Sequence, residues 1–244
     1  MPALLEGHRL AVRFGGVAAL KGVDLAVDAG EVLSVIGPNG AGKTTLFNVI
    51  TGRVRPAAGA VLFDGEPIHR LAPFRIALLG VVRTFQKTEV FGPLRLIDGV
   101  AAGALARNDP NPLARASEAL STVGLDRKAH LSAQQLSYGD QRLLEIAQAL
   151  AAKPKVLLLD EPASGMNHHE SKRIMKLIVE LRARGLAMIL VEHNMHVVMS
   201  ISDRVIVINY GEKIAEGRPD HVRNDARVIE AYLGVPQAAD ARAR

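Results

Sequence analysis

The chain has 244 residues, 48% of them hydrophobic, which suits one large α/β domain with a sizeable core and excludes a mostly disordered protein. It contains no cysteine, so disulfides and thiol chemistry are excluded, and no apolar run approaches the roughly 18–20 residues that span a bilayer. The formal net charge of +5 comes from scattered Lys and Arg among few aromatic residues, so we expect no nucleic-acid partner.

The first third of the chain alternates short apolar runs with Gly and Asp, which is typical of strands. Strands are predicted at residues 8–14, 23–27, 32–36 and 59–64, with a loop and helix at 37–51. Residues 94–136 are rich in Ala, Leu and Arg and are interrupted at residues 108–112, which predicts a small helical subdomain.

The remainder returns to an α/β pattern. Amphipathic spacing predicts helices at residues 137–152 and 168–184. Continuous apolar runs at residues 155–159 and 186–191 predict buried strands of a parallel sheet. Two further strands, at residues 203–209 and 212–215, flank a Tyr-Gly turn and predict a hairpin.

A glycine-rich loop follows the strand at residues 32–36 and has the spacing G-x-x-x-x-G-K-[ST]. The candidate nucleotide-binding residues here are Gly37, Pro38, Asn39, Gly40, Ala41, Gly42, Lys43, Thr44 and Thr45. The glycines let backbone N–H groups converge on a phosphate, and the helix that follows adds its positive end. Lys43 supplies charge for the β- and γ-phosphates, and the Thr44 hydroxyl can ligate Mg²⁺. The loop predicts a nucleoside triphosphate site, but leaves kinases, GTPases and motors open.

A second motif is the apolar strand that ends in Asp160 and Glu161. Successive strand residues point to opposite faces, so one carboxylate can address a metal while the other addresses water. We assign Asp160 to Mg²⁺ through its water shell and Glu161 to the attacking water. The alternative, an acidic pair that merely ends a strand, does not account for the phosphate loop earlier in the chain.

Residues 136–142 read Leu-Ser-Tyr-Gly-Asp-Gln-Arg and resemble the signature motif of ABC ATPases, whose usual form is L-S-G-G-Q. Ser137 could simply cap a helix, but with both other motifs present the chain is identified as a member of the ABC ATPase family. The resemblance implies that Ser137 and Gly139 serve ATP held by a second subunit, so that a dimer has two shared sites. Asp140 replaces the usual Gln, which would place a negative charge near the partner's nucleotide if the side chain faces that way.

The resemblance implies roles for residues that carry little signal alone. Gln86 occupies the Q-loop position, where it would reach the metal or water, and His193 occupies the switch position, where it would contact the γ-phosphate. Phe14 matches the aromatic that stacks on adenine, although it could equally be a core residue. Residues 164–167 match the D-loop, which contacts the partner subunit. Phe91 is a candidate contact with a membrane permease.

The implied fold is that of ABC ATPases: a P-loop NTPase core with a mainly parallel sheet, an antiparallel β edge subdomain and an inserted helical subdomain. We expect one ATP-binding domain over residues 5–236, with the helical subdomain at about 90–150. Residues 237–244 are expected to form a disordered tail.

Within this family, the chain resembles the ATP-binding subunits of branched-chain amino acid importers. The resemblance is carried by residues 82–86 (Val-Arg-Thr-Phe-Gln), the Leu-Ser-Tyr-Gly signature, Asn167 and residues 231–234 (Ala-Tyr-Leu-Gly). The implied cofactors are ATP and Mg²⁺. The implied partners are a second nucleotide-binding subunit, identical or related, a membrane permease and, indirectly, a substrate-binding protein. The chain would then be peripheral, at the cytoplasmic face of the cell membrane. An exporter subunit of the lipopolysaccharide type and a non-transport ABC ATPase remain the alternatives.

Overall fold

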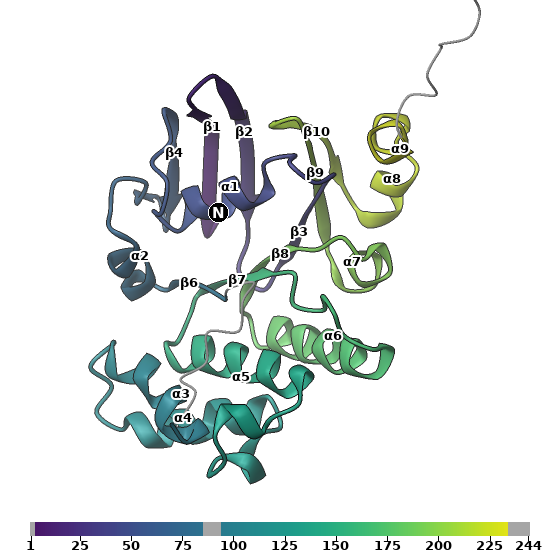
Figure 1. Cartoon of the computed structure of the whole chain (residues 1–244). Coiled ribbons are helices and arrows are strands. Elements are labelled where there is room, and N and C mark those ends of the chain that lie inside the picture. The colour runs from purple at the N-terminus through teal and green to yellow at the C-terminus, as the bar shows by residue number, and fades with distance from the viewer. Residues whose placement is uncertain (1–2, 85–93, 234–244) are drawn as a thin grey trace, which may run out of the picture.

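The computed structural model describes residues 3–84 and 94–233 (Figure 1). Gln86 and Phe91 lie outside the described residues, as does the expected tail at residues 237–244. Figure 1 shows an antiparallel sheet at the top, a group of helices at the bottom and a larger sheet between them. Within the described part, no helix is both long and apolar enough to cross a bilayer.

The larger sheet has six strands in the order β10-β9-β3-β8-β7-β6. In that order the strands are Glu212–Gly217, Arg204–Asn209, Val32–Ile36, Ala187–Val191, Val156–Asp160 and Val81–Arg83. All neighbours are parallel except β10, which runs antiparallel to β9. Every residue of β3, β7 and β8 is buried, because both faces of the sheet are covered. The predicted parallel core and the hairpin are therefore confirmed.

The smaller sheet has the order β2-β1-β4-β5 and is antiparallel throughout. Its strands are β1 (Leu5–Phe14), β2 (Val17–Val27), β4 (Ala58–Phe63) and β5 (Glu66–Pro67). Helix α1 (Lys43–Ile50) packs between the two sheets, where Phe47 joins one hydrophobic cluster with Leu5 and Val35. This packing fixes the helix that the phosphate loop opens.

The helices below the larger sheet in Figure 1 are α3 (Leu96–Leu105), α4 (Pro112–Thr122), α5 (Tyr138–Ala151) and α6 (His168–Ala183). Two 3₁₀ turns, η1 (Asp126–Lys128) and η2 (Ala133–Gln135), connect α4 to α5. Leu96, Leu120 and Leu144 of the first three helices share one hydrophobic cluster with Leu157 of β7. The helical segment and the sheet are thus built on a common core.

Several short elements follow no long periodic pattern and are not predicted from the sequence. They are β6 and the helices α2 (Pro73–Leu79), α7 (Met195–Ile201), α8 (Pro219–Arg223) and α9 (Ala226–Leu233). Helices of this length depend on tertiary packing more than on intrinsic propensity. In α7, for example, the Asn194 side chain caps the helix by accepting from the N–H groups of His196 and Val197.

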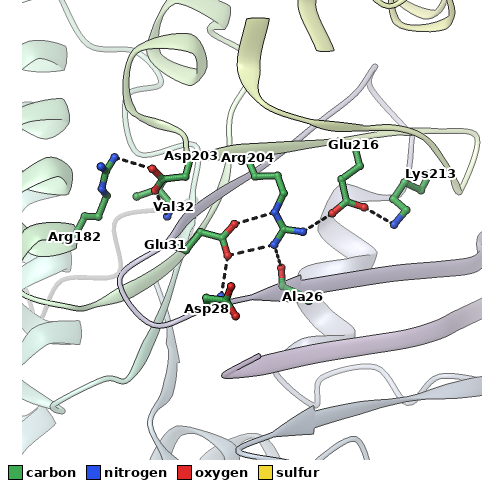
Figure 2. Close-up of polar contacts among 9 residues, drawn as sticks. All are labelled: Ala26, Asp28, Glu31, Val32, Arg182, Asp203, Arg204, Lys213 and Glu216. Atoms are coloured by element: carbon green, nitrogen blue, oxygen red, sulfur yellow. Dashed lines mark hydrogen bonds and ion pairs between the residues drawn. The ribbon is translucent and has the colours of Figure 1, made fainter. Parts of the chain in front are cut away.

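An ion-pair cluster joins both sheets at the amino ends of the parallel strands (Figure 2). Arg204 of β9 donates to both carboxylate oxygens of Glu31, at 2.9 and 3.2 Å, and to the carbonyl of Ala26 at 2.6 Å. It also pairs with Glu216 of β10. Phosphate-loop residues follow the opposite, carboxyl end of β3, so the cluster is expected to affect stability rather than nucleotide binding.

Replacing Arg204 by Ala is expected to lower the free energy of unfolding by about 2 kcal/mol, because the largely buried Glu31 loses its charged partner. Urea denaturation followed by circular dichroism measures the loss. Lys176→Ala is the control, since Lys176 and Glu180 are exposed and 3.7 Å apart and should contribute less than about 0.5 kcal/mol. Equal stabilities of the two variants would contradict a structural role for the cluster.

Candidate functional site

The phosphate loop passes too close to two neighbouring backbones to carry side chains at Gly37 and Gly42. A Cβ on Gly37 would lie 2.0 Å from the Ile208 carbonyl oxygen, and one on Gly42 would lie 2.6 Å from that of Ala19. Both glycines also have positive φ, 151° and 113°, which strains other residues. The loop therefore needs glycine at these positions for steric as well as conformational reasons.

Lys43 lies inside the curve of this loop. Its Nζ donates to the carbonyl oxygens of Gly37 at 2.7 Å and Pro38 at 2.9 Å. Burial lowers the pKa of Lys43, while the negative charges of Glu161 and Asp160 act in the opposite direction. The ammonium group is thus held where phosphate oxygens bound by the loop would meet it.

A cavity of about 450 Å³ opens at the loop. The predicted residues that line it are Asn39, Gly40, Ala41, Gly42, Lys43, Thr44, Thr45 and Glu161. Five further lining residues were not predicted from the sequence: Val17, Ala18, Ala19, Lys21 and Tyr210. Phosphate-binding backbone, a cationic side chain and a carboxylate therefore meet in one cavity.

Two exposed aromatic side chains are candidates for contact with the base of a nucleotide bound in this cavity. Phe14 ends β1 and is 51% exposed, which excludes a core position, but it is absent from the described residues that line the cavity. Tyr210 is 78% exposed in the β9–β10 turn and does line the cavity. Gly211 N donates to the Ala41 carbonyl at 2.9 Å, so this turn is bonded to the phosphate loop. The sequence signals the turn but not its distant partner.

Asp160 is 1% exposed and is held by Arg83, whose Nη2 donates to Oδ2 at 2.6 Å. Arg83 also donates to Asn48 Oδ1 at 2.7 Å and lies over the Phe47 ring, so it links β6, α1 and β7. In the sequence, Arg83 stands out only as part of the motif at residues 82–86. Its contact with Asp160 fixes the orientation of the carboxylate.

The residues present fit a Mg²⁺ ion. The second carboxylate oxygen of Asp160, Oδ1, is buried and has no hydrogen-bond partner among the described residues. Thr44, whose side chain carries a hydroxyl oxygen, lines the cavity. Oxygen donors of this kind suit a hard cation that keeps several of its waters. Gln86, the third predicted metal ligand, is outside the described residues.

Glu161 follows β7 directly and has a left-handed backbone, with φ of 48°. Its N–H donates to the Val191 carbonyl at 2.8 Å, which ties the turn to the end of β8. The His193 Nδ1 lies 3.8 Å from Glu161 Oε2, so these two predicted catalytic residues are brought together. A non-glycine residue in this conformation costs about 1–3 kcal/mol and is commonly retained at functional sites.

Glu192 is a buried residue that the sequence analysis did not single out. It is 1% exposed. Its carboxylate accepts from the N–H groups of Ala163 at 3.0 Å, His193 at 3.1 Å and Asn194 at 3.3 Å. It therefore ties the segment after Glu161 to the segment that carries His193. The only sequence signal is an acidic residue at the end of an apolar strand.

Ser137 begins α5 and caps it, since its Oγ accepts from Asp140 N at 3.3 Å. Neither Ser137 nor Gly139 belongs to the described residues that line the cavity. Ser137 is exposed and its hydroxyl proton remains free to donate elsewhere, so capping and phosphate binding are compatible. Asp140 does not face outward: it is 4% exposed and pairs with Lys128 and Arg173.

Comparison with known proteins gives concordant results. A family described as "ABC transporter" matches residues 20–164, and one described as "Branched-chain amino acid ATP-binding cassette transporter" matches residues 212–238. The high-affinity branched-chain amino acid transport ATP-binding proteins BraF of Pseudomonas aeruginosa and LivG of Escherichia coli are each 41% identical, over 95% of this chain and 98% of theirs. The lipopolysaccharide export system ATP-binding protein LptB of Haemophilus influenzae is 34% identical over 95% of this chain and 98% of its own.

Solved structures agree with the fold. The ADP conformation of MJ1267, an ATP-binding cassette of an ABC transporter, superposes with a TM-score of 0.87 at 31% identity, covering 96% of this chain and 100% of the other. The dimeric structure of MJ0796, a bacterial ABC transporter cassette, superposes with a TM-score of 0.78 at 26% identity, covering 88% and 98%. The expected fold class, with its parallel core and antiparallel subdomain, is confirmed.

Proposed function

Because the chain belongs to the ABC transporter ATP-binding proteins of the branched-chain amino acid transport family, we propose that it hydrolyses ATP with Mg²⁺ to drive import of branched-chain or other hydrophobic amino acids. The observation that supports this proposal most strongly is that Lys43, Thr44 and Glu161 line the same cavity. The family match at residues 212–238 and the higher identity to BraF than to LptB favour amino-acid import over lipopolysaccharide export.

In the proposed site, backbone N–H groups of residues 37–44 and the Lys43 ammonium hold the ATP phosphates. Glu161 orients water for in-line attack on the γ-phosphate, and His193 contacts that phosphate beside it. Thr44 and Asp160 would hold Mg²⁺, which when bound neutralises charge on the phosphates. Arg83 keeps Asp160 in place. Gln86 would act at the same centre, on the metal or the water.

The same proposal includes a dimer with shared sites. Ser137 and Gly139 of one copy face the ATP held by the other, which accords with their absence from the described lining of their own cavity. The dimeric cassette MJ0796 is a relative in which two copies associate. We place the dimer under a membrane permease at the cytoplasmic face, with residues 5–236 forming one domain and about 90–150 the helical part that meets the permease.

Uptake of labelled leucine tests the proposed function. Deleting the gene is expected to abolish high-affinity uptake, and the wild-type chain should restore it while the Lys43→Ala chain, made to equal levels, should not. Normal uptake in the deletion strain would contradict amino-acid import. Restoration by the Lys43→Ala chain would instead show that ATP binding at this cavity is not needed.

Adenine recognition gives a separate prediction. We expect Phe14→Ala to weaken ATP binding about tenfold, because stacking of a base on an aromatic ring contributes about 1–3 kcal/mol. Titration with a fluorescent ATP analogue measures the change. Tyr210→Ala is the matched variant, since Tyr210 is also exposed and lines the cavity. If Tyr210→Ala weakened ATP binding tenfold and Phe14→Ala did not weaken it, the adenine site would lie at the β9–β10 turn and not at Phe14.

A further inference from the structure

Three consecutive residues of the signature segment (residues 137–140) contact the D-loop segment (residues 164–167) or the helix that follows it. The first contact is made by Tyr138, whose hydroxyl donates to the Ser164 carbonyl at 3.1 Å. Its ring also lies against Gly165, where an added Cβ would be 3.4 Å from Tyr138 Cε1. Tyr138 therefore packs on the D-loop of its own chain.

The second contact is made by Gly139. A Cβ added there would lie 2.6 Å from Glu170 Oε1, so the backbone of the signature segment touches α6 directly. Glu170 is itself held, because its other oxygen, Oε2, accepts from Asn167 N at 3.1 Å. The glycine thus fits against a side chain that belongs to the cap of α6.

The third contact is made by Asp140, which is 4% exposed. Its Oδ1 accepts from Arg173 Nη1 of α6 at 3.0 Å, and its Oδ2 accepts from Lys128 of η1. Burial acts to raise the pKa of Asp140, but the hydrogen bonds from Lys128 and Arg173 outweigh it and the pKa is lowered. A carboxylate in the first turn of α5 is also stabilised by the helix dipole.

Tyr138 and Asp140 occupy the positions where the usual signature motif has Gly and Gln. We propose that Tyr138 and Asp140 are positioning residues that fix the signature segment to the D-loop segment and α6. Ser137 and Gly139 then approach the ATP of the partner chain as one unit with the D-loop. This inference rests on the proposed function, in which both segments serve the partner's site.

A mixed dimer with one intact site tests the inference. Two differently tagged copies both carry Glu161→Gln, so that ATP is retained, and one also carries Lys43→Ala. The only intact site then combines the phosphate loop of the copy that retains Lys43 with the signature segment of the Lys43→Ala copy. Asp140→Asn is placed first in the Lys43→Ala copy and then in the other copy. Tyr138→Phe, which removes one hydroxyl and keeps the ring, is placed in the same two ways.

Retention of radiolabelled ATP by the purified mixed dimer is the readout. In the Lys43→Ala copy, Asp140→Asn is expected to shorten the retention half-time about tenfold and Tyr138→Phe about threefold, because the loosened segment contacts ATP less well. In the other copy, either substitution should leave the half-time within about twofold. A general loss of stability would not depend on which copy carries the change. Equal half-times in the two placements would overturn the inference.

Ser137→Arg separates this inference from the proposed function. Placed in the Lys43→Ala copy it should abolish retention, and placed in the other copy it should have no effect. If Ser137→Arg depends on placement while Asp140→Asn and Tyr138→Phe do not, the positioning role fails and the shared site stands. If Ser137→Arg acts equally in both placements, the shared site fails and the inference fails with it.

Discussion

Replacing Glu161 by Gln is expected to lower ATP turnover by ~10²-fold or more while leaving ATP binding intact. Glu161 lies at the cavity beside Thr44 and Lys43, and its backbone is fixed by the bond from its N–H to Val191. Gln has nearly the same shape, so the turn and its contacts are retained. What is lost is the carboxylate that accepts a hydrogen bond from the attacking water.

Phosphate release and size-exclusion chromatography with ATP measure the two halves of this prediction. The variant should bind ATP, release little phosphate and elute as a stable dimer, because the step that separates the copies is blocked. Glu180→Gln is the control, since Glu180 is an exposed residue of α6 that pairs with Lys176, and the turnover of this variant should be unchanged. Wild-type hydrolysis in Glu161→Gln would contradict the catalytic role of Glu161.

Much of the fold could be predicted because its strands are encoded locally. The predicted strands at residues 155–159 and 186–191 are apolar throughout except at Lys155, and continuous apolar residues are typical of parallel strands buried on both faces. The observed strands β7 (Val156–Asp160) and β8 (Ala187–Val191) agree with them within one residue. The short helix α7 could not be predicted in the same way, because its seven residues gain stability from packing and a cap.

The candidate site also contains some residues that a local sequence pattern predicts and others that only tertiary contacts reveal. Lys43, Asp160 and Glu161 belong to motifs in which neighbours along the chain carry the chemistry, so spacing alone predicts them. Arg83 and Glu192 act on partners that are distant in sequence, Asp160 and Ala163, and no local pattern marks such contacts. Only the folded chain brings them together.

Asp140 shows where a local pattern leaves the direction of a side chain open. Its place in the signature motif would put a negative charge near the partner's nucleotide only if the side chain faced that way. The carboxylate turns inward, where Lys128 and Arg173 each donate to one of its oxygens and leave Asp140 only 4% exposed. The sequence lists all three residues but does not show that η1, α5 and α6 converge.

The second large effect concerns the sharing of ATP sites between copies. Lys43→Ala removes the charge that holds the phosphates of one loop, and Ser137→Arg fills the space that the partner's phosphate would need. When the two changes are on different copies of a mixed dimer, both should damage one site and leave the other intact. When both substitutions are on the same copy, each should damage a different site, so that neither ATP site of the dimer stays intact.

Counting ATP retained per mixed dimer, with Glu161→Gln in both copies, tests the shared-site claim most directly. Tandem affinity purification isolates dimers that hold one copy of each tag. We expect one ATP per dimer when Lys43→Ala and Ser137→Arg are on different copies, and none when they are on the same copy. The reverse result, none on different copies and one on the same copy, would show that each chain completes its own site and would contradict shared sites.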